Sequence, residues 1–218
     1  MIVKICGVTV VEDGIAALEA GADMLGFNFY PHSPRFVSPE ACRTLVSALL
    51  AHGPPFVAVG VFVDCAPGEV RRLMQQCGLH LAQLSGDEPP ADLCEIGPGR
   101  AFKAIHCSGA LAAESARQYA VTPGETRPAL LLDAAAGPGQ YGGTGLSADW
   151  RVAAGLAIDY PLLLAGGLRP DNVADAVRTV RPWGVDVASG VESRPGRKDP
   201  ARMRAFIEAA RSAAASHA

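Results

Sequence analysis

The sequence has few aromatic residues, no long apolar run and no large excess of charge of either sign. Aromatic residues make up 6% of the 218 positions, and the formal net charge is −3, with 19 scattered basic residues. Such a surface does not suit the nucleic-acid backbone, so we expect no nucleic-acid partner. The apolar runs fall far short of the roughly 20 residues that cross a bilayer, so we expect no membrane insertion. No basic segment followed by an apolar stretch opens the chain, and we expect a cytoplasmic protein.

Motifs for metals, disulfides and dinucleotides are also missing. The six cysteines are widely spaced, with no C-x-x-C pair and no Cys/His cluster, so we expect reduced thiols, most of them buried as small apolar side chains. No pairing of His with carboxylates suits a metal-dependent epimerase, so we expect no metal. The glycine-rich G-x-G-x-x-G loop is absent after the first apolar run, which argues against a Rossmann-type dehydrogenase.

What the sequence does contain is a regular alternation of short apolar runs with longer, amphipathic, Ala-rich stretches. The runs predict strands at 2–5, 24–27, 57–62, 80–84, 101–105, 129–132, 162–165 and 185–187. The stretches predict helices at 10–20, 39–51, 66–77, 110–119, 147–154, 171–180 and 200–213, with a weaker one between 89 and 96. Eight βα units without a linker favour one closed (β/α)₈ barrel over residues 1–218 rather than an open doubly wound sheet.

Local signals predict where some helices begin. Thr9 stands three residues before Glu12, which predicts a capping box. Ser38 and Asp199 each precede a proline, an arrangement typical of a cap residue followed by a first-turn proline.

Two strand ends carry candidate acid–base residues, because active sites of such barrels form where strands end. Cys6 ends the first strand and shares a face with Lys4, whose ammonium would favour a thiolate, usable as a base or nucleophile near neutral pH. The alternative for Cys6 is a packed core thiol. Asp133 follows the sixth apolar run and precedes a glycine-rich loop, where it is either functional or a loop hydrogen-bonding residue.

The last two strand ends predict a phosphate site. Gly166 and Gly167 follow the seventh run, and Ser189 and Gly190 follow the eighth, where barrels of this kind often bind phosphate. Tight turns alone also require glycine. Arg35, on a proline-stiffened loop after the second strand, suits a carboxylate or phosphate clamp, or is a surface residue.

Short stretches along the chain match one family in order and spacing. They are Lys4-Ile5-Cys6-Gly7-Val8-Thr9, Gly21-Ala22-Asp23 with Gly26-Phe27, Ser33-Pro34-Arg35, Gly60-Val61-Phe62-Val63, Gln83-Leu84, Leu132-Asp133-Ala134, Gly143-Thr144-Gly145, Ala165-Gly166-Gly167-Leu168 with Asn172-Val173, Gly184-Val185-Asp186-Val187 and Ser189-Gly190-Val191-Glu192. Over essentially its whole length the chain resembles the phosphoribosylanthranilate isomerases of tryptophan biosynthesis.

The resemblance implies a (β/α)₈ barrel that performs an Amadori rearrangement of a phosphosugar, N-(5-phosphoribosyl)anthranilate, with no cofactor and no metal. By position, Cys6 would be the general base and Asp133 the general acid, with environments that push their pKa values in useful directions. Arg35 would pair with the anthranilate carboxylate, and we expect the loop from 137 to 145 to close over substrate. Further contacts would come from Asp186, Gly143 and Gly145 to the substrate, and from Gly166, Gly167, Ser189 and Gly190 to its phosphate.

Two positions depart from the family pattern, and other readings stay open. Ser85 stands where the family usually has histidine, and Ala188 where it often has serine. The related histidine-pathway sugar isomerases use a carboxylate at the position of Cys6, which favours the anthranilate substrate, although an enzyme that accepts both substrates is not excluded. A non-catalytic phosphosugar-binding barrel would not need Cys6 and Asp133. The sequence leaves the choice between monomer and homodimer open.

Overall fold

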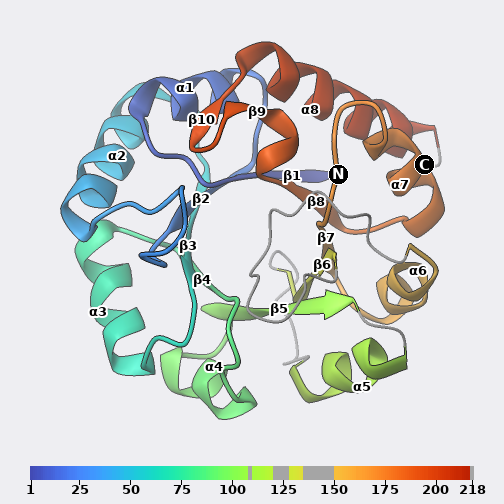
Figure 1. The fold of residues 1–218 in the computed structure, drawn as a ribbon, viewed down its shortest axis with the longest axis horizontal. Coiled ribbons are helices and arrows are strands. Elements are labelled where there is room, and N and C mark those ends of the chain that lie inside the picture. Colours follow the sequence, from blue (N-terminus) through green and yellow to red (C-terminus); the bar gives the residue numbers. More distant parts are fainter. Residues whose placement is uncertain (108–109, 120–127, 135–149, 217–218) are drawn as a thin grey trace.

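The chain folds into a closed barrel of eight parallel strands surrounded by helices (Figure 1). The computed structural model describes residues 1–107, 110–119, 128–134 and 150–216. The barrel strands, hydrogen-bonded in chain order, are β1 (Ile2–Cys6), β2 (Met24–Asn28), β3 (Val57–Phe62), β4 (Leu81–Leu84), β5 (Ala101–Cys107), β6 (Leu130–Ala134), β7 (Leu162–Leu164) and β8 (Gly184–Val187). The predicted single-domain (β/α)₈ barrel is therefore confirmed, and each predicted strand overlaps an observed one.

Helices cover the outside of the barrel. They are α1 (Val11–Glu19), α2 (Pro39–His52), α3 (Pro67–Cys77), α4 (Pro90–Ile96), α5 (Ala110–Tyr119), α6 (Trp150–Asp159), α7 (Val173–Val180) and α8 (Pro200–Ala215). The described part of α6 continues five residues past its predicted end, because a helix tolerates Gly155 at a cost of only about 1 kcal/mol and Leu156 is buried beneath it. In the part of the chain that is described, no helix is long and apolar enough to span a membrane.

The two predicted proline-linked helix starts are confirmed, and the capping box is not. The Ser38 side chain accepts a hydrogen bond from the Ala41 backbone N–H, and the Asp199 side chain accepts from Ala201 and Arg202. Helix α1 instead begins after Val10 without a side-chain cap. The Thr9 hydroxyl donates to the Gly196 carbonyl at 2.6 Å, because a hairpin from the far end of the chain lies beside it.

That hairpin is an addition to the barrel that the alternation of runs did not predict. A single turn of 3₁₀ helix (Ser189–Val191) follows β8, and two short antiparallel strands come next, β9 (Glu192–Arg194) and β10 (Arg197–Lys198). These strands have three and two residues, too short to show a period in the sequence.

Alternation along the strands separates an outer from an inner core. One set of strand side chains, with Val3 and Leu25 as examples, packs against the helices. The other set fills the barrel interior and comprises Met24, Val59, Leu81, Phe102, Ala104, Leu131, Leu163 and Ala165. The same inward face carries Lys4, Cys6, Gln83 and Asp186 towards the carboxyl ends of the strands. The barrel thus has an apolar floor below a polar end.

The thiols described are free, as the sequence predicted. Three of them, Cys6, Cys42 and Cys77, are buried, whereas Cys65 is partly exposed and Cys94 is exposed.

Candidate active site

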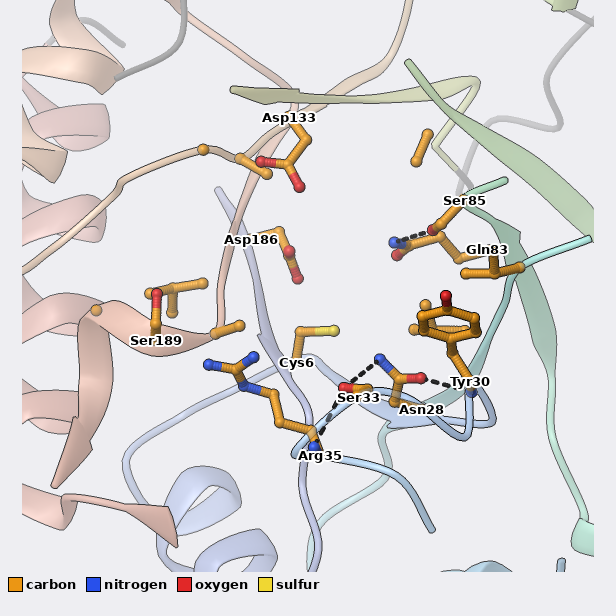
Figure 2. Close-up of a pocket in the computed structure, with 18 of the residues that line it drawn as sticks. Cys6, Asn28, Tyr30, Ser33, Arg35, Gln83, Ser85, Asp133, Asp186 and Ser189 are labelled. Carbon is orange, nitrogen blue, oxygen red and sulfur yellow. Dashed lines mark hydrogen bonds between the residues drawn. The ribbon is translucent and has the colours of Figure 1, made fainter. Parts of the chain in front are cut away.

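A cavity of about 310 Å³ opens at the carboxyl ends of the strands, where the barrel rule places active sites. Figure 2 shows the side chains that converge on it. The cavity is lined by eight of the ten predicted site residues: Cys6, Arg35, Asp133, Gly166, Gly167, Asp186, Ser189 and Gly190. The other two, Gly143 and Gly145, lie outside the described residues, as does the loop from 137 to 145 that we expected to close. Tertiary structure therefore brings together residues that come from five different strand ends.

Cys6 stands above a buried ion pair. Lys4 and Asp186 are partners in the register of β1 and β8, and the Lys4 ammonium lies 2.7 Å from Asp186 Oδ1 with no exposed surface. A Cβ added to Gly26 on β2 would approach the Cys6 sulfur to 2.8 Å and the Lys4 nitrogen to 3.2 Å. The bare glycine therefore makes the space in which thiol and ammonium sit together.

The expected activation of Cys6 by Lys4 is outweighed by burial. Removal from water raises the pKa of the Cys6 thiol above its ordinary value, and the Asp186 carboxylate adds to the rise. Lys4 and Lys198 act in the opposite direction without reversing it. The net shift of the Cys6 pKa is therefore upward, opposite to the shift expected for a thiolate near neutral pH, although the contribution of Lys4 has the predicted direction. Burial alone would lower the pKa of Lys4, but Asp186 and Cys6 raise it, so Lys4 stays charged.

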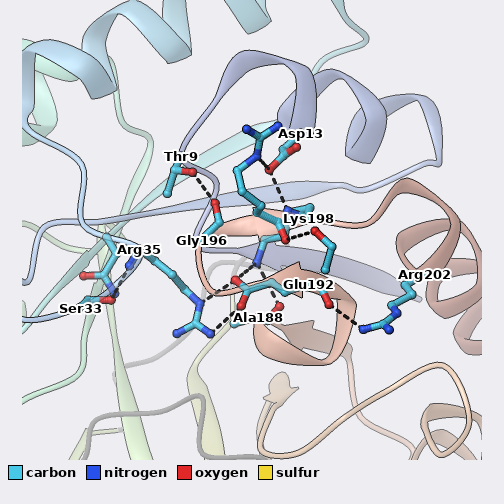
Figure 3. A network of polar contacts seen from close by, with 12 residues as sticks. Thr9, Asp13, Ser33, Arg35, Ala188, Glu192, Gly196, Lys198 and Arg202 are labelled. Atoms are coloured by element: carbon cyan, nitrogen blue, oxygen red, sulfur yellow. Dashed lines mark hydrogen bonds and ion pairs between the residues drawn. The ribbon is translucent and has the colours of Figure 1, made fainter.

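Arg35 is held from behind by Glu192, as Figure 3 shows. Its Nε and Nη2 donate to the two Glu192 carboxylate oxygens, both at 2.8 Å, in a bidentate pair. The Arg35 side chain is 13% exposed and that of Glu192 is 5% exposed, which excludes the surface-residue reading of Arg35. Arg35 and Lys198 hold the pKa of Glu192 below its usual value against the effect of burial. One edge of the guanidinium, formed by Nε and Nη2, is therefore occupied, and Nη1 is the nitrogen outside this pair.

Lys198 extends this pair to the loop after β8. Its fully buried ammonium donates to Glu192 at 2.9 Å and to the Ala188 carbonyl at 3.0 Å. Its backbone N–H donates to the buried Asp13 carboxylate at 2.8 Å. The β9–β10 hairpin thereby ties the loop after β8 to Arg35 and to the first helix (Figure 3). Sequence reasoning missed Glu192 and Lys198, although Glu192 ends one of the matching stretches.

The loops after β7 and β8 meet at the cavity. Gly166 and Gly167 have φ angles of 88° and 64°, a left-handed conformation that glycine adopts without strain. At Gly190, a Cβ would come within 1.9 Å of the Leu168 carbonyl oxygen, so the two loops pack at a distance that only glycine permits. Asn172 secures the first loop by donating to the Gly167 carbonyl at 3.0 Å. This geometry suits the predicted phosphate site, whose role remains a prediction.

A polar wall, which we define as Asn28, Tyr30, Ser33, Gln83 and Ser85, closes the side of the cavity formed by β2 and β4 (Figure 2). Asn28 donates to the Ser33 hydroxyl at 3.3 Å and accepts from the Tyr30 backbone N–H at 2.8 Å. Gln83 Nε2 donates to the Ser85 hydroxyl at 3.1 Å. None of these residues was predicted to be a site residue, although Ser33 and Gln83 stand in the matching stretches, Ser85 was noted as a departure from the family, and inward alternation from Leu81 indicates Gln83.

Metal ligands do not gather in this region. Among the described residues, no three His, Cys, Asp or Glu side chains are grouped as they would be around a metal ion.

Comparison with known proteins identifies the family. The family described as "N-(5'phosphoribosyl)anthranilate (PRA) isomerase" matches residues 3–209. The chain belongs to this isomerase family. The phosphoribosylanthranilate isomerase of Geobacter sulfurreducens is 48% identical over 210 residues, which cover 96% of this chain and 98% of that protein. The sequence-based expectation of an isomerase of tryptophan biosynthesis is thereby confirmed.

Solved phosphoribosylanthranilate isomerases have the same fold. The crystal structure of the enzyme from Thermotoga maritima is 38% identical, covers 97% of this chain and 100% of its own, and superposes with a TM-score of 0.86. A second crystal structure, 36% identical with a TM-score of 0.82, covers 97% of this chain and 100% of its own and is a complex with reduced 1-(o-carboxyphenylamino)-1-deoxyribulose 5-phosphate. The family match and these identities favour a phosphoribosylanthranilate isomerase over a histidine-pathway sugar isomerase.

Proposed function

We propose that this phosphoribosylanthranilate isomerase converts N-(5-phosphoribosyl)anthranilate to 1-(2-carboxyphenylamino)-1-deoxyribulose 5-phosphate by general acid–base catalysis in the described cavity. The observation that carries the proposal is that Asp133, at the end of β6, and Cys6, at the end of β1, line one cavity with the two glycine-rich loops. The complex of a relative with a reduced form of the product supports the substrate class.

In the first step, the protonated Asp133 donates its proton to the furanose ring oxygen of the substrate. The bond between this oxygen and C1′ breaks, the electron pair stays on the oxygen as a hydroxyl, and the nitrogen lone pair forms a C1′ iminium. The position of Asp133 supports this role: Leu131, two residues earlier, faces the barrel interior, the strand period carries Asp133 to the same face, and Asp133 lines the cavity.

In the second step, the Cys6 thiolate removes the proton from C2′, which the neighbouring iminium has made acidic. The electron pair of the broken C–H bond forms the C1′–C2′ double bond of an enolamine, and the iminium nitrogen becomes neutral. Tautomerisation of the enol then produces the ketone. Lys4, buried beside the sulfur, stabilises the thiolate while it forms, and Asp186 keeps Lys4 in place.

The two ends of the substrate are held by different parts of the rim. The phosphate lies against Gly166, Gly167, Ser189 and Gly190, and Asp186 accepts a hydrogen bond from a ribose hydroxyl. The anthranilate carboxylate pairs with Arg35, whose Nη1 lies outside the Glu192 contact.

Replacing Glu192 with glutamine should mainly raise KM, on the order of 10-fold, because Arg35 then loses the carboxylate that orients it. The variant also leaves Lys198 without its anion, so its folding is checked by thermal unfolding. Glu208→Gln, at an exposed position of α8, is the matched control. Steady-state kinetics should show little further effect of Glu192→Gln in an Arg35→Ala background. An unchanged KM in a folded Glu192→Gln protein would contradict this role of the pair.

The proposed reaction is tested by adding purified protein to freshly generated phosphoribosylanthranilate and following the loss of its anthranilate fluorescence. We expect rapid, catalytic loss. The aminoimidazole substrate of the histidine-pathway isomerases is assayed in parallel. Turnover of that substrate alone would refute the proposal, turnover of both would identify an enzyme with two substrates, and turnover of neither by folded protein would favour a binding role.

A further inference from the structure

Gln83 carries a buried hydrogen-bond acceptor that has no partner in the described part of the chain. The residue is 6% exposed and its side chain lines the cavity. Its Nε2 donates a hydrogen bond to the Ser85 hydroxyl, but its Oε1 accepts no hydrogen bond from any described residue. Buried carbonyl oxygens of side-chain amides nearly always find a donor, so an acceptor without a partner, on a side chain that lines a cavity, points to a donor on the ligand.

The position of Gln83 determines which part of the ligand can reach it. In a closed barrel of eight strands, β4 lies across from β8, the strand that precedes the Ser189 loop. Cys6 is on β1, next to β8, and in Figure 2 its sulfur points towards the side of the site where Tyr30, Gln83 and Ser85 lie. With the phosphate at the loops after β7 and β8 and C2′ at Cys6, the part of the substrate that extends to β4 is C1′ with its nitrogen and aromatic ring.

The substrate has one donor at that end. The anthranilate carboxylate and the ring oxygen only accept hydrogen bonds, whereas the nitrogen between C1′ and the aromatic ring carries an N–H. This N–H would otherwise bond to the ortho carboxylate, but Arg35 competes for that carboxylate. When the ring opens, the nitrogen becomes a cationic iminium whose N–H is a stronger donor, and hydrogen bonds that involve a charged partner are the stronger ones.

We propose that Gln83 is a substrate-binding residue whose Oε1 accepts a hydrogen bond from the N–H between the sugar and the aromatic ring. The proposal rests on the proposed function. Gln83 lines the cavity, and its Nε2 donates to the Ser85 hydroxyl, which leaves Oε1 as the amide atom without a partner in the described chain. Since the bond strengthens in the iminium, Gln83 supports the chemical step as well as binding.

The test is a double-mutant cycle in which one change is made in the protein, at Gln83, and the other in the ligand, at the N–H. Reduced 1-(o-carboxyphenylamino)-1-deoxyribulose 5-phosphate, which keeps the N–H, and its N-methyl derivative, which lacks it, are titrated calorimetrically into wild type and Gln83→Leu. We expect the wild type to prefer the N–H form on the order of 10-fold, and Gln83→Leu to lose this preference. Ribose 5-phosphate, which has no such nitrogen, should bind both proteins within about twofold.

Two further variants separate the acceptor from the rest of the wall. Gln83→Glu keeps an acceptor oxygen and should keep the preference, whereas Ser85→Ala removes the partner of Nε2 and should lower the preference less than Gln83→Leu does. Equal preference in wild type and Gln83→Leu, or an equal loss of ribose 5-phosphate affinity, would overturn the proposal. If Gln83→Leu does not fold, a wild type that does not discriminate between the two analogues overturns it as well. Wild-type turnover together with either result leaves the proposed function standing, whereas absent turnover refutes that function itself.

Discussion

Asp133→Asn should reduce kcat by about 10²- to 10⁴-fold, the usual contribution of a general acid. The side-chain amide of asparagine has nearly the same shape as the carboxyl group of aspartic acid but cannot transfer a proton to the ring oxygen. Ring opening therefore proceeds without its general acid. KM should change little, because the phosphate loops and Arg35 lie at other strand ends. The measurement is the loss of anthranilate fluorescence at saturating substrate, with the affinity for the reduced product analogue determined separately.

The control for this variant is Asp175→Asn, which removes an exposed carboxylate of α7 that pairs with Arg178. Its turnover should equal that of wild type. If Asp133→Asn keeps near-native kcat, another group protonates the ring oxygen, and the acid must be sought elsewhere in the cavity.

Cys6→Ala should also lower kcat by about 10²- to 10⁴-fold while analogue binding is largely kept. The thiol is buried above the Lys4–Asp186 pair, so its removal leaves a small space and no unpaired charge. In wild type, the limb of the kcat/KM profile that depends on Cys6 should rise with pH until the thiol is deprotonated. Because burial raises the pKa of Cys6, this rise should be centred above the ordinary thiol value of about 8.5.

Lys4 supplies a second check on the same base. Lys4→Met removes a cation that favours the thiolate, so the rise in kcat/KM should move to still higher pH. Lys103→Met is the matched control, since Lys103 is also buried and ion-paired, to Glu88 at 2.7 Å, but does not line the cavity. Lys4→Met combined with Asp186→Asn avoids a lone buried carboxylate if the single variant is unstable. A profile that keeps its position in both Lys4 variants would contradict the assignment of Cys6 as the base.

Regularities within short segments were enough to predict the barrel and much of its rim. The apolar runs and amphipathic stretches are local, as are the strand period that sets Cys6 and Lys4 on one face and the glycines that follow β7 and β8. Combined with the rule that barrel sites form at strand ends, these features indicated seven residues that the structure places around one cavity, and the family resemblance added Asp186. The capping box failed because the Thr9 hydroxyl has a partner, Gly196, on a segment 187 residues away.

The sequence by itself determined the barrel and the face of the site, and it predicted the residue types proposed for the acid, the base and the phosphate contacts. Only the tertiary structure decided the state of those residues. Arg35 meets Glu192 across 157 residues and Lys4 meets Asp186 across 182, and no spacing rule connects positions so far apart. Burial, which reversed the expected direction of the Cys6 pKa shift and left Gln83 Oε1 without a donor in the described chain, depends on every neighbouring strand. Electrostatic free energies depend on distance and solvent exposure, and both are properties of the closed barrel rather than of any segment.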